Sequence, residues 1–139
     1  MADIHIQWGS ETAEQITVHS FEELEQILDL VQHTTSSTCP TLATIEGLHD
    51  YSIYLGLGSD VSILVFQVSQ PDDNGWRQEY ISRGERGSTT LYSFWLHNAH
   101  HTEFPGEYIL PTSRVRQLLQ EYDQQKTLPT TIEWDVNTF

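Results

Sequence analysis

Residues 51–68, YSIYLGLGSDVSILVFQV, decide the fold of this chain. The two runs at residues 51–57 and 61–68 are rich in β-branched, aromatic and other apolar residues, a composition typical of strands. Between them, Gly58-Ser59-Asp60 supplies the residues of a tight turn. The stretch therefore predicts a β-hairpin, and its short connection makes the two strands antiparallel.

Further strands are predicted on both sides of this hairpin. Alternating or continuous short apolar runs indicate them at residues 4–8, 16–19, 42–45, 76–82, 89–96 and 132–136. Pro71-Asp-Asp-Asn-Gly75 is a dense turn signal that ends the hairpin. Residues 97–106 are predicted to form a loop.

Two segments have the period of an amphipathic helix. Ser20 opens the first, because Glu23 follows it at the spacing of a capping box. The apolar residues of this helix share one face: Phe21, Leu24, Ile27, Leu28 and Val31. The second helix is expected to have Thr112 or Ser113 as its N-cap and Lys126 near its end, where a cation suits the helix dipole. Its apolar stripe is Val115, Leu118, Leu119 and Tyr122.

This order of elements predicts an α+β fold in one domain that spans residues 1–139. Consecutive strands with short turns imply a mainly antiparallel sheet of about six to eight strands. The two amphipathic helices are expected to pack on one face of the sheet. A chain of 139 residues can bury a core without disulfides or metal ions.

Acidic residues outnumber basic residues, and their distribution is uneven. The chain has 20 Asp and Glu against 6 Lys and Arg, a formal net charge of −14. Residues 1–76 contain 12 acidic residues and no Lys or Arg. Phosphate contacts need clustered Lys and Arg, so the composition argues against a protein that binds nucleic acid or an anionic membrane surface. A charged partner is expected to be basic.

The remaining composition indicates a cytoplasmic protein. Cys39 is the one cysteine, so no intramolecular disulfide can form, as expected in a reducing compartment. The first residues lack the basic and apolar regions of a signal peptide. The apolar runs are also too short to span a membrane.

Acidic residues of the first predicted helix form one candidate docking surface. Glu22, Glu25 and Asp29 are spaced so that they share the solvent face opposite the apolar stripe. The helix dipole does not account for Asp29, and no Lys or Arg lies on this helix. The face is either simply solvated or a docking surface for a basic protein, where complementary charge raises the association rate. Further candidates lie at predicted turn tips: Asp60, Asp72 and Asp73.

The segment His97-Asn-Ala-His100-His101-Thr-Glu103 is the most metal-like part of the chain. Zinc sites use His and carboxylate ligands, but this spacing matches neither the two-His pattern on a helix nor a Cys/His finger. Paired carboxylates such as Glu103 and Glu107 can perform acid–base chemistry, although no candidate nucleophile lies nearby in the sequence. A polar loop therefore fits better, and we predict no metal, no cofactor and no catalytic residue.

Four stretches carry a family resemblance. The first is Tyr54-Leu-Gly-Leu-Gly-Ser59 with the following Val61-Ser-Ile-Leu-Val65, and the second is Glu79-Tyr-Ile-Ser-Arg-Gly84. The strongest is Glu103-Phe-Pro-Gly-Glu-Tyr-Ile-Leu-Pro111, and Leu128-Pro-Thr-Thr-Ile-Glu-Trp134 is similar to a terminal signature. In this order, the stretches resemble the immunity proteins of bacterial polymorphic toxin systems, in particular the first-numbered immunity family.

The resemblance implies a small α+β inhibitor, without catalysis, that binds a cognate toxin of the nucleic-acid deaminase class. Such a toxin needs a basic substrate groove, which an acidic surface of this protein would cover. Four residues are interpreted as fold determinants rather than contacts, namely turn glycines, a helix-entry proline and a buried aromatic anchor: Gly56, Gly58, Pro111 and Trp134. The alternatives are a generic acidic interaction module and a metal-dependent enzyme that uses the His97–Glu103 segment.

Overall fold

The computed structural model of the protein describes residues 3–8, 15–84, 89–97 and 100–138. The helices are α1 (Phe21–Thr34), α2 (Thr112–Gln125) and the single 3₁₀ turn η1 (Gly106–Tyr108). The strands are β1 (Ile4–Gln7), β2 (Ile16–Val18), β3 (Thr41–Glu46), β4 (Tyr51–Leu57), β5 (Val61–Ser62), β6 (Leu64–Val68), β7 (Gln78–Ser82), β8 (Leu91–His97), β9 (His100–Pro105), β10 (Leu110–Pro111) and β11 (Trp134–Thr138). The predicted α+β class is confirmed.

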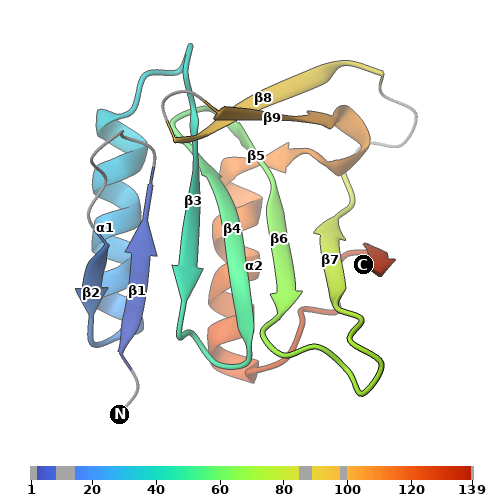
Figure 1. Ribbon diagram of the computed structural model, residues 1–139. Coiled ribbons are helices and arrows are strands. Elements are labelled where there is room, and N and C mark those ends of the chain that lie inside the picture. The colour runs from blue at the N-terminus through green and yellow to red at the C-terminus, as the bar shows by residue number, and fades with distance from the viewer. Residues whose placement is uncertain (1–2, 9–14, 85–88, 98–99, 139) are drawn as a thin grey trace.

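One large sheet organises the described part of the chain. It has nine strands, seven of them in the order β11-β7-β6-β4-β3-β1-β2, and the β8–β9 hairpin joins it beside β3 (Figure 1). All of these pairings are antiparallel except one parallel bridge between Thr41 of β3 and Trp95 of β8. The bridge is available because β1 pairs only with the later part of β3, which leaves the start of that edge open.

The hairpin at residues 51–68 is confirmed. Strand β4 pairs with β6 from Tyr51↔Val68 to Leu55↔Leu64. The returning strand is divided at Ile63, and its first part, β5, pairs instead with β10 in a separate two-stranded sheet. This small sheet connects the turn after β4 to the start of α2.

The predicted loop at residues 97–106 is wrong, because strand β9 occupies His100–Pro105 and η1 follows it. Tyr92 pairs with Phe104 across the β8–β9 hairpin, and the rings of Phe94 and Phe104 lie 6.3 Å apart. Only Phe104 in this strand is a large apolar residue, so the polar neighbours hid the strand pattern. The additional strand helps to bring the sheet above the expected six to eight strands.

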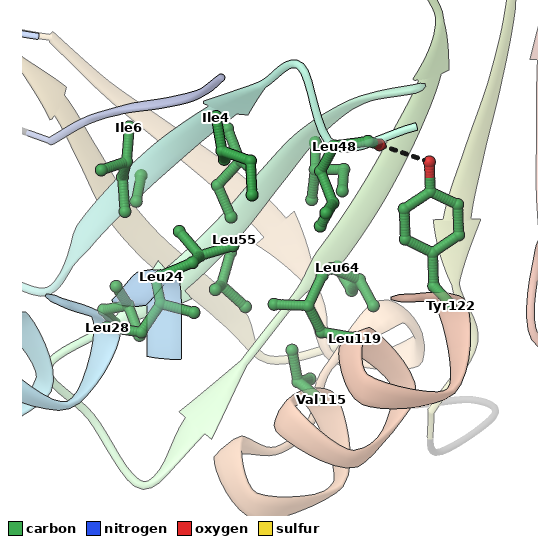
Figure 2. Packing of buried hydrophobic residues seen from close by; sticks show 14 of the residues in the cluster. Ile4, Ile6, Leu24, Leu28, Leu48, Leu55, Leu64, Val115, Leu119 and Tyr122 are labelled. Atoms are coloured by element: carbon green, nitrogen blue, oxygen red, sulfur yellow. Dashed lines mark hydrogen bonds between the residues drawn. The ribbon is translucent and has the colours of Figure 1, made fainter. Parts of the chain in front are cut away.

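Both long helices pack on one face of the sheet, as predicted (Figure 1). Their apolar stripes meet the sheet residues in one core, part of which is shown in Figure 2. The helix side chains with the least exposure are Leu24, Leu28, Val31, Val115, Leu118, Leu119 and Tyr122. No helix in the described ranges is long and apolar enough to cross a membrane.

The predicted capping box at the start of α1 is confirmed with one difference. The backbone N–H of Glu23 donates to the Ser20 hydroxyl at 3.1 Å. The Glu23 carboxylate, however, accepts from the backbone N–H of His19 at 2.9 Å, one residue before the usual partner. The first contact satisfies a backbone donor that the helix leaves unpaired, and the second satisfies the donor of the residue just before the N-cap.

The predicted N-cap of α2 at Thr112 or Ser113 is wrong, because Pro111 occupies that position without a side-chain cap. The turn after β4 supplies the missing acceptors. The backbone N–H of Thr112 donates to the Asp60 carbonyl at 2.8 Å, and its hydroxyl donates to the Ser59 carbonyl at 2.7 Å. A turn distant in the sequence therefore accepts from the first backbone N–H of this helix.

The opposite face of the sheet carries a second, smaller core. It consists of Leu42, Ile63, Val65, Ile81, Phe94 and Ile109. The β8–β9 hairpin crosses one end of the sheet at the top of Figure 1 and supplies Phe94 to this core. None of the helices in the described part of the chain covers the rest of that face.

Candidate functional site

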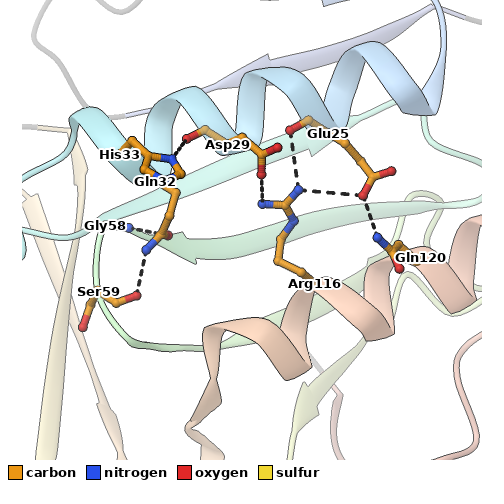
Figure 3. A network of polar contacts seen from close by, with 8 residues as sticks. All are labelled: Glu25, Asp29, Gln32, His33, Gly58, Ser59, Arg116 and Gln120. Atoms are coloured by element: carbon orange, nitrogen blue, oxygen red, sulfur yellow. Dashed lines mark hydrogen bonds and ion pairs between the residues drawn. The ribbon is translucent and has the colours of Figure 1, made fainter.

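The acidic face of α1 lies next to an arginine from α2. Arg116 Nη1 is 2.9 Å from Asp29 Oδ1, and Arg116 Nη2 is 3.8 Å from Glu25 Oε2 (Figure 3). Glu25 also accepts from the Gln120 side-chain amide at 2.7 Å. Asp29 is exposed, as predicted for the solvent face, and the cation that the first helix lacks comes from the neighbouring helix.

Of the three acidic residues predicted on that face, Glu22 keeps an unpaired charge. It is exposed, and the structure places no side-chain partner beside it among the described residues. Glu25 and Asp29 instead connect α1 to α2, which explains why two like charges at i and i+4 are tolerated on one helix. The helix face is thus partly an internal contact between elements.

Replacing Arg116 with Gln is expected to lower the free energy of unfolding by about 1 kcal/mol, since it leaves Glu25 and Asp29 as an uncompensated pair. Urea denaturation measures the difference. Arg77→Gln is the control, because Arg77 is exposed and forms no ion pair among the described residues; its effect should stay within about 0.5 kcal/mol. Equal effects in the two variants would mean that the bridge contributes nothing.

The three predicted turn acids have different surroundings. Asp72 accepts from the backbone N–H groups of Asn74 and Trp76, each at 2.9 Å, so it organises its own turn. Asp73 is exposed, and no side-chain contact is found for it within the described ranges. Asp60 is exposed at the turn before β5. The six predicted acidic residues therefore belong to three separate elements rather than one cluster.

A glutamine that the sequence pattern did not single out holds the turn after β4 against α1. The Gln32 side-chain amide donates to the Ser59 carbonyl at 3.0 Å and accepts from the Gly58 backbone N–H at 2.9 Å (Figure 3). Gly58 has φ +105°, a conformation that favours glycine. A polar side chain on a helix flank gives no sequence signal for such a contact.

The other residues interpreted as fold determinants lie at close packing contacts. A Cβ on Gly56 would lie 2.5 Å from the Phe94 ring, so the absence of a side chain lets the β8–β9 hairpin approach. Pro111 ends β10 directly before α2. Trp134 is half-buried, with its ring 5.3 Å from that of Phe66 and its indole N–H donating to the Pro129 carbonyl at 2.8 Å.

Three of the four stretches that carry the family resemblance, all except Leu128–Trp134, contribute residues to the lining of a cavity of about 510 Å³. Its lining includes Arg83, Gly84, Gly106 and Pro111. Arg83 forms an ion pair with Asp135 of β11. Asp135 also shares a hydrogen bond with Tyr108 that, together with burial, raises the pKa of the Tyr108 hydroxyl to about 12. The charges of Arg83 and Asp135 therefore compensate each other. Together with Tyr108, the two residues connect the segments that contain β7, η1 and β11.

The predicted metal-like segment is divided between two strands. His97 ends β8, while His100 begins β9 and pairs with it. Residues 98 and 99 lie outside the described residues. Within the described ranges, His, Cys, Asp and Glu do not form a group of three that could hold a metal ion.

Comparison with known proteins places these features in a family. The profile of the family described as Immunity protein Imm1 matches residues 12–135, a range that includes α1, α2 and most of the sheet. No curated protein matches the chain. Because the matched range covers most of the sequence, the chain belongs to the Imm1 family of immunity proteins.

Proposed function

We propose that the protein protects its host cell by binding a cognate toxin of the nucleic-acid deaminase class and covering that toxin's basic substrate groove with an acidic surface. Membership of the Imm1 immunity protein family is the observation that carries the proposal. The large negative charge of the chain, −14, supports the electrostatic part.

The distribution of ion pairs leaves most of this charge available to a partner. Arg83, Arg114 and Arg116 each contact an acidic side chain of the same molecule. Exposed acidic side chains such as Glu22, Asp60 and Asp73 have no such cation beside them among the described residues. They supply long-range attraction toward a basic surface.

An acidic surface suits inhibition of an enzyme that acts on nucleic acid. The substrate of such a toxin carries a phosphate charge at every nucleotide, so its groove is lined with Lys and Arg. A protein that presents carboxylates to that groove competes with the nucleic acid for the same cations. Complementary potentials also raise the association rate, which matters for an inhibitor that must act before the toxin does.

The test uses the cognate toxin domain, produced as an inactive variant; the gene immediately upstream is the first place to look for it. We expect a 1:1 complex by light scattering, with an association rate constant that falls about tenfold or more between roughly 50 and 500 mM salt. With the active toxin, a stoichiometric amount of this protein should abolish base deamination. The proposal fails if no complex forms, or if the complex forms but deamination continues.

A further inference from the structure

The sheet face without helices carries a row of polar side chains that crosses most of the sheet. Strand pairing aligns His5 with Glu46, Ser52 with Gln67, and Gln67 with Glu79, and Asn137 extends the row on β11. The Ser52 hydroxyl of β4 donates to Glu46 Oε2 of β3 at 2.7 Å, which connects the side chains on β1 and β3 with those on β4, β6 and β7. We call His5, Glu46, Ser52, Gln67, Glu79 and Asn137 the polar row.

Neutral donors hold both carboxylates of the polar row. The Gln67 side-chain amide donates to Glu79 Oε2 at 2.8 Å, as the Ser52 hydroxyl does to Glu46. No Lys or Arg belongs to the row, and the ion pairs of the described residues do not include Glu46 or Glu79. Both carboxylates are thus held in position by neutral donors, whereas Glu25 and Asp29 lie beside the cation of Arg116.

A groove of about 230 Å³ lies between the polar row and the β8–β9 hairpin. Its floor is formed by sheet residues and its wall by the hairpin: Tyr54, Val65 and Glu79 below, and Leu96, Thr102 and Phe104 beside them. Tyr54 is half-buried, and burial, with the charges of Glu46 and Glu79 next, raises the pKa of its hydroxyl. The groove therefore combines an apolar wall, a neutral aromatic ring and negative charge.

This combination matches an arginine side chain. A guanidinium group stacks on an aromatic ring and donates to carboxylates, and the methylene stem of arginine packs against apolar surface. A carboxylate that already holds a neutral donor keeps lone pairs for a charged one. A groove lined by Tyr54 and the carboxylate of Glu79, with Glu46 on the adjoining polar row, is therefore a better fit for a cationic group than for an anion or an apolar segment.

We infer that this groove is the contact site for the toxin and that it receives an arginine-bearing segment from the toxin's substrate groove. The inference rests on the proposed function, because it takes the partner to be a protein with a basic groove. It assigns different roles to the two groups of acidic residues. Exposed acids elsewhere accelerate the encounter, whereas Glu46 and Glu79 hold the partner once it is bound.

The main test is the double variant Glu46→Gln and Glu79→Gln, which removes two charges but keeps acceptors for Ser52 and Gln67. We expect the dissociation rate constant of the complex with the inactive toxin domain to rise about 10–100-fold. The matched control is Glu22→Gln with Asp73→Asn, which removes the same charge from exposed positions. Its dissociation rate constant should change less than about threefold, with the effect confined to association.

A second variant blocks the groove without changing any charge. Thr102 is exposed and lines the groove, so Thr102→Trp should fill it and abolish the complex. Circular dichroism and melting temperature check that every variant is folded. If the unmodified protein binds the toxin but Thr102→Trp and the Glu46/Glu79 variant bind equally well, the groove is not the contact site and the proposed function stands. If the unmodified protein does not bind, both proposals fail.

Discussion

Replacing Tyr122 with alanine is expected to lower the free energy of unfolding by about 3–5 kcal/mol, a large fraction of the stability of a domain of this size. Tyr122 is fully buried on α2, with its ring centroid 4.8 Å from that of Phe66 and 5.8 Å from that of Tyr51. Its hydroxyl donates to the Leu48 carbonyl at 2.6 Å (Figure 2). The substitution leaves a cavity where the second helix meets the sheet.

A second variant separates the contribution of the Tyr122 hydroxyl to the free energy of unfolding from that of the ring. Tyr122→Phe keeps the ring but leaves the buried Leu48 carbonyl without this donor, so we expect a loss of about 1–3 kcal/mol. Urea denaturation of the two variants and the unmodified protein gives both values. A loss below about 1 kcal/mol for Tyr122→Ala would contradict the packing described for this aromatic cluster.

Replacing Gly84 with alanine is expected to cost about 3 kcal/mol, at the upper end for overpacking. A Cβ at this position would lie 1.8 Å from the Ile109 carbonyl oxygen and 2.7 Å from its carbon. The backbone is held there, because the Gly84 N–H donates to the Glu107 carbonyl at 2.7 Å. The chain must therefore separate the end of β7 from the segment after η1 to admit one methyl group.

Gly75 provides the matched control for this substitution. It has φ +82°, but a Cβ there would meet no atom within 4 Å. Gly75→Ala should therefore cost only about 1 kcal/mol, from backbone strain alone. Melting temperatures and urea denaturation compare the two variants. If both cost the same, the close contact at Gly84 does not determine stability.

The two largest expected effects concern Tyr122 and Gly84, and the sequence predicts the role of the first but not that of the second. Tyr122 was predicted to face the core, because it completes the apolar stripe of α2. Gly84 occurred in a family-like stretch, yet no pattern marked it as a site where a Cβ would lie 1.8 Å from a backbone oxygen. Helix periodicity is a local property, whereas the approach of two backbone segments separated by 25 residues is not.

For the candidate docking surface too, the sequence predicted the charge but not which side chains lie together. Composition predicted an acidic protein with a basic partner, but the sequence of the acidic helix did not show that Arg116, on another helix, pairs with two of its carboxylates. Glu46 and Glu79 are 33 positions apart and gave no signal together in the sequence. Strand register alone aligns them on one face of the sheet.

The sequence by itself determined the elements whose signals are local. These are the hairpin at residues 51–68, the capped first helix, the apolar stripes of both helices and the large negative charge. The tertiary structure decided which elements lie side by side: β9 against β8, Asp60 at the start of α2, Arg116 beside α1 and the polar row across the sheet. Periodicity and capping act over a few residues, so a sequence displays them directly. Strand register and contacts between elements depend on the packing of the whole core, so they exist only once the chain has folded.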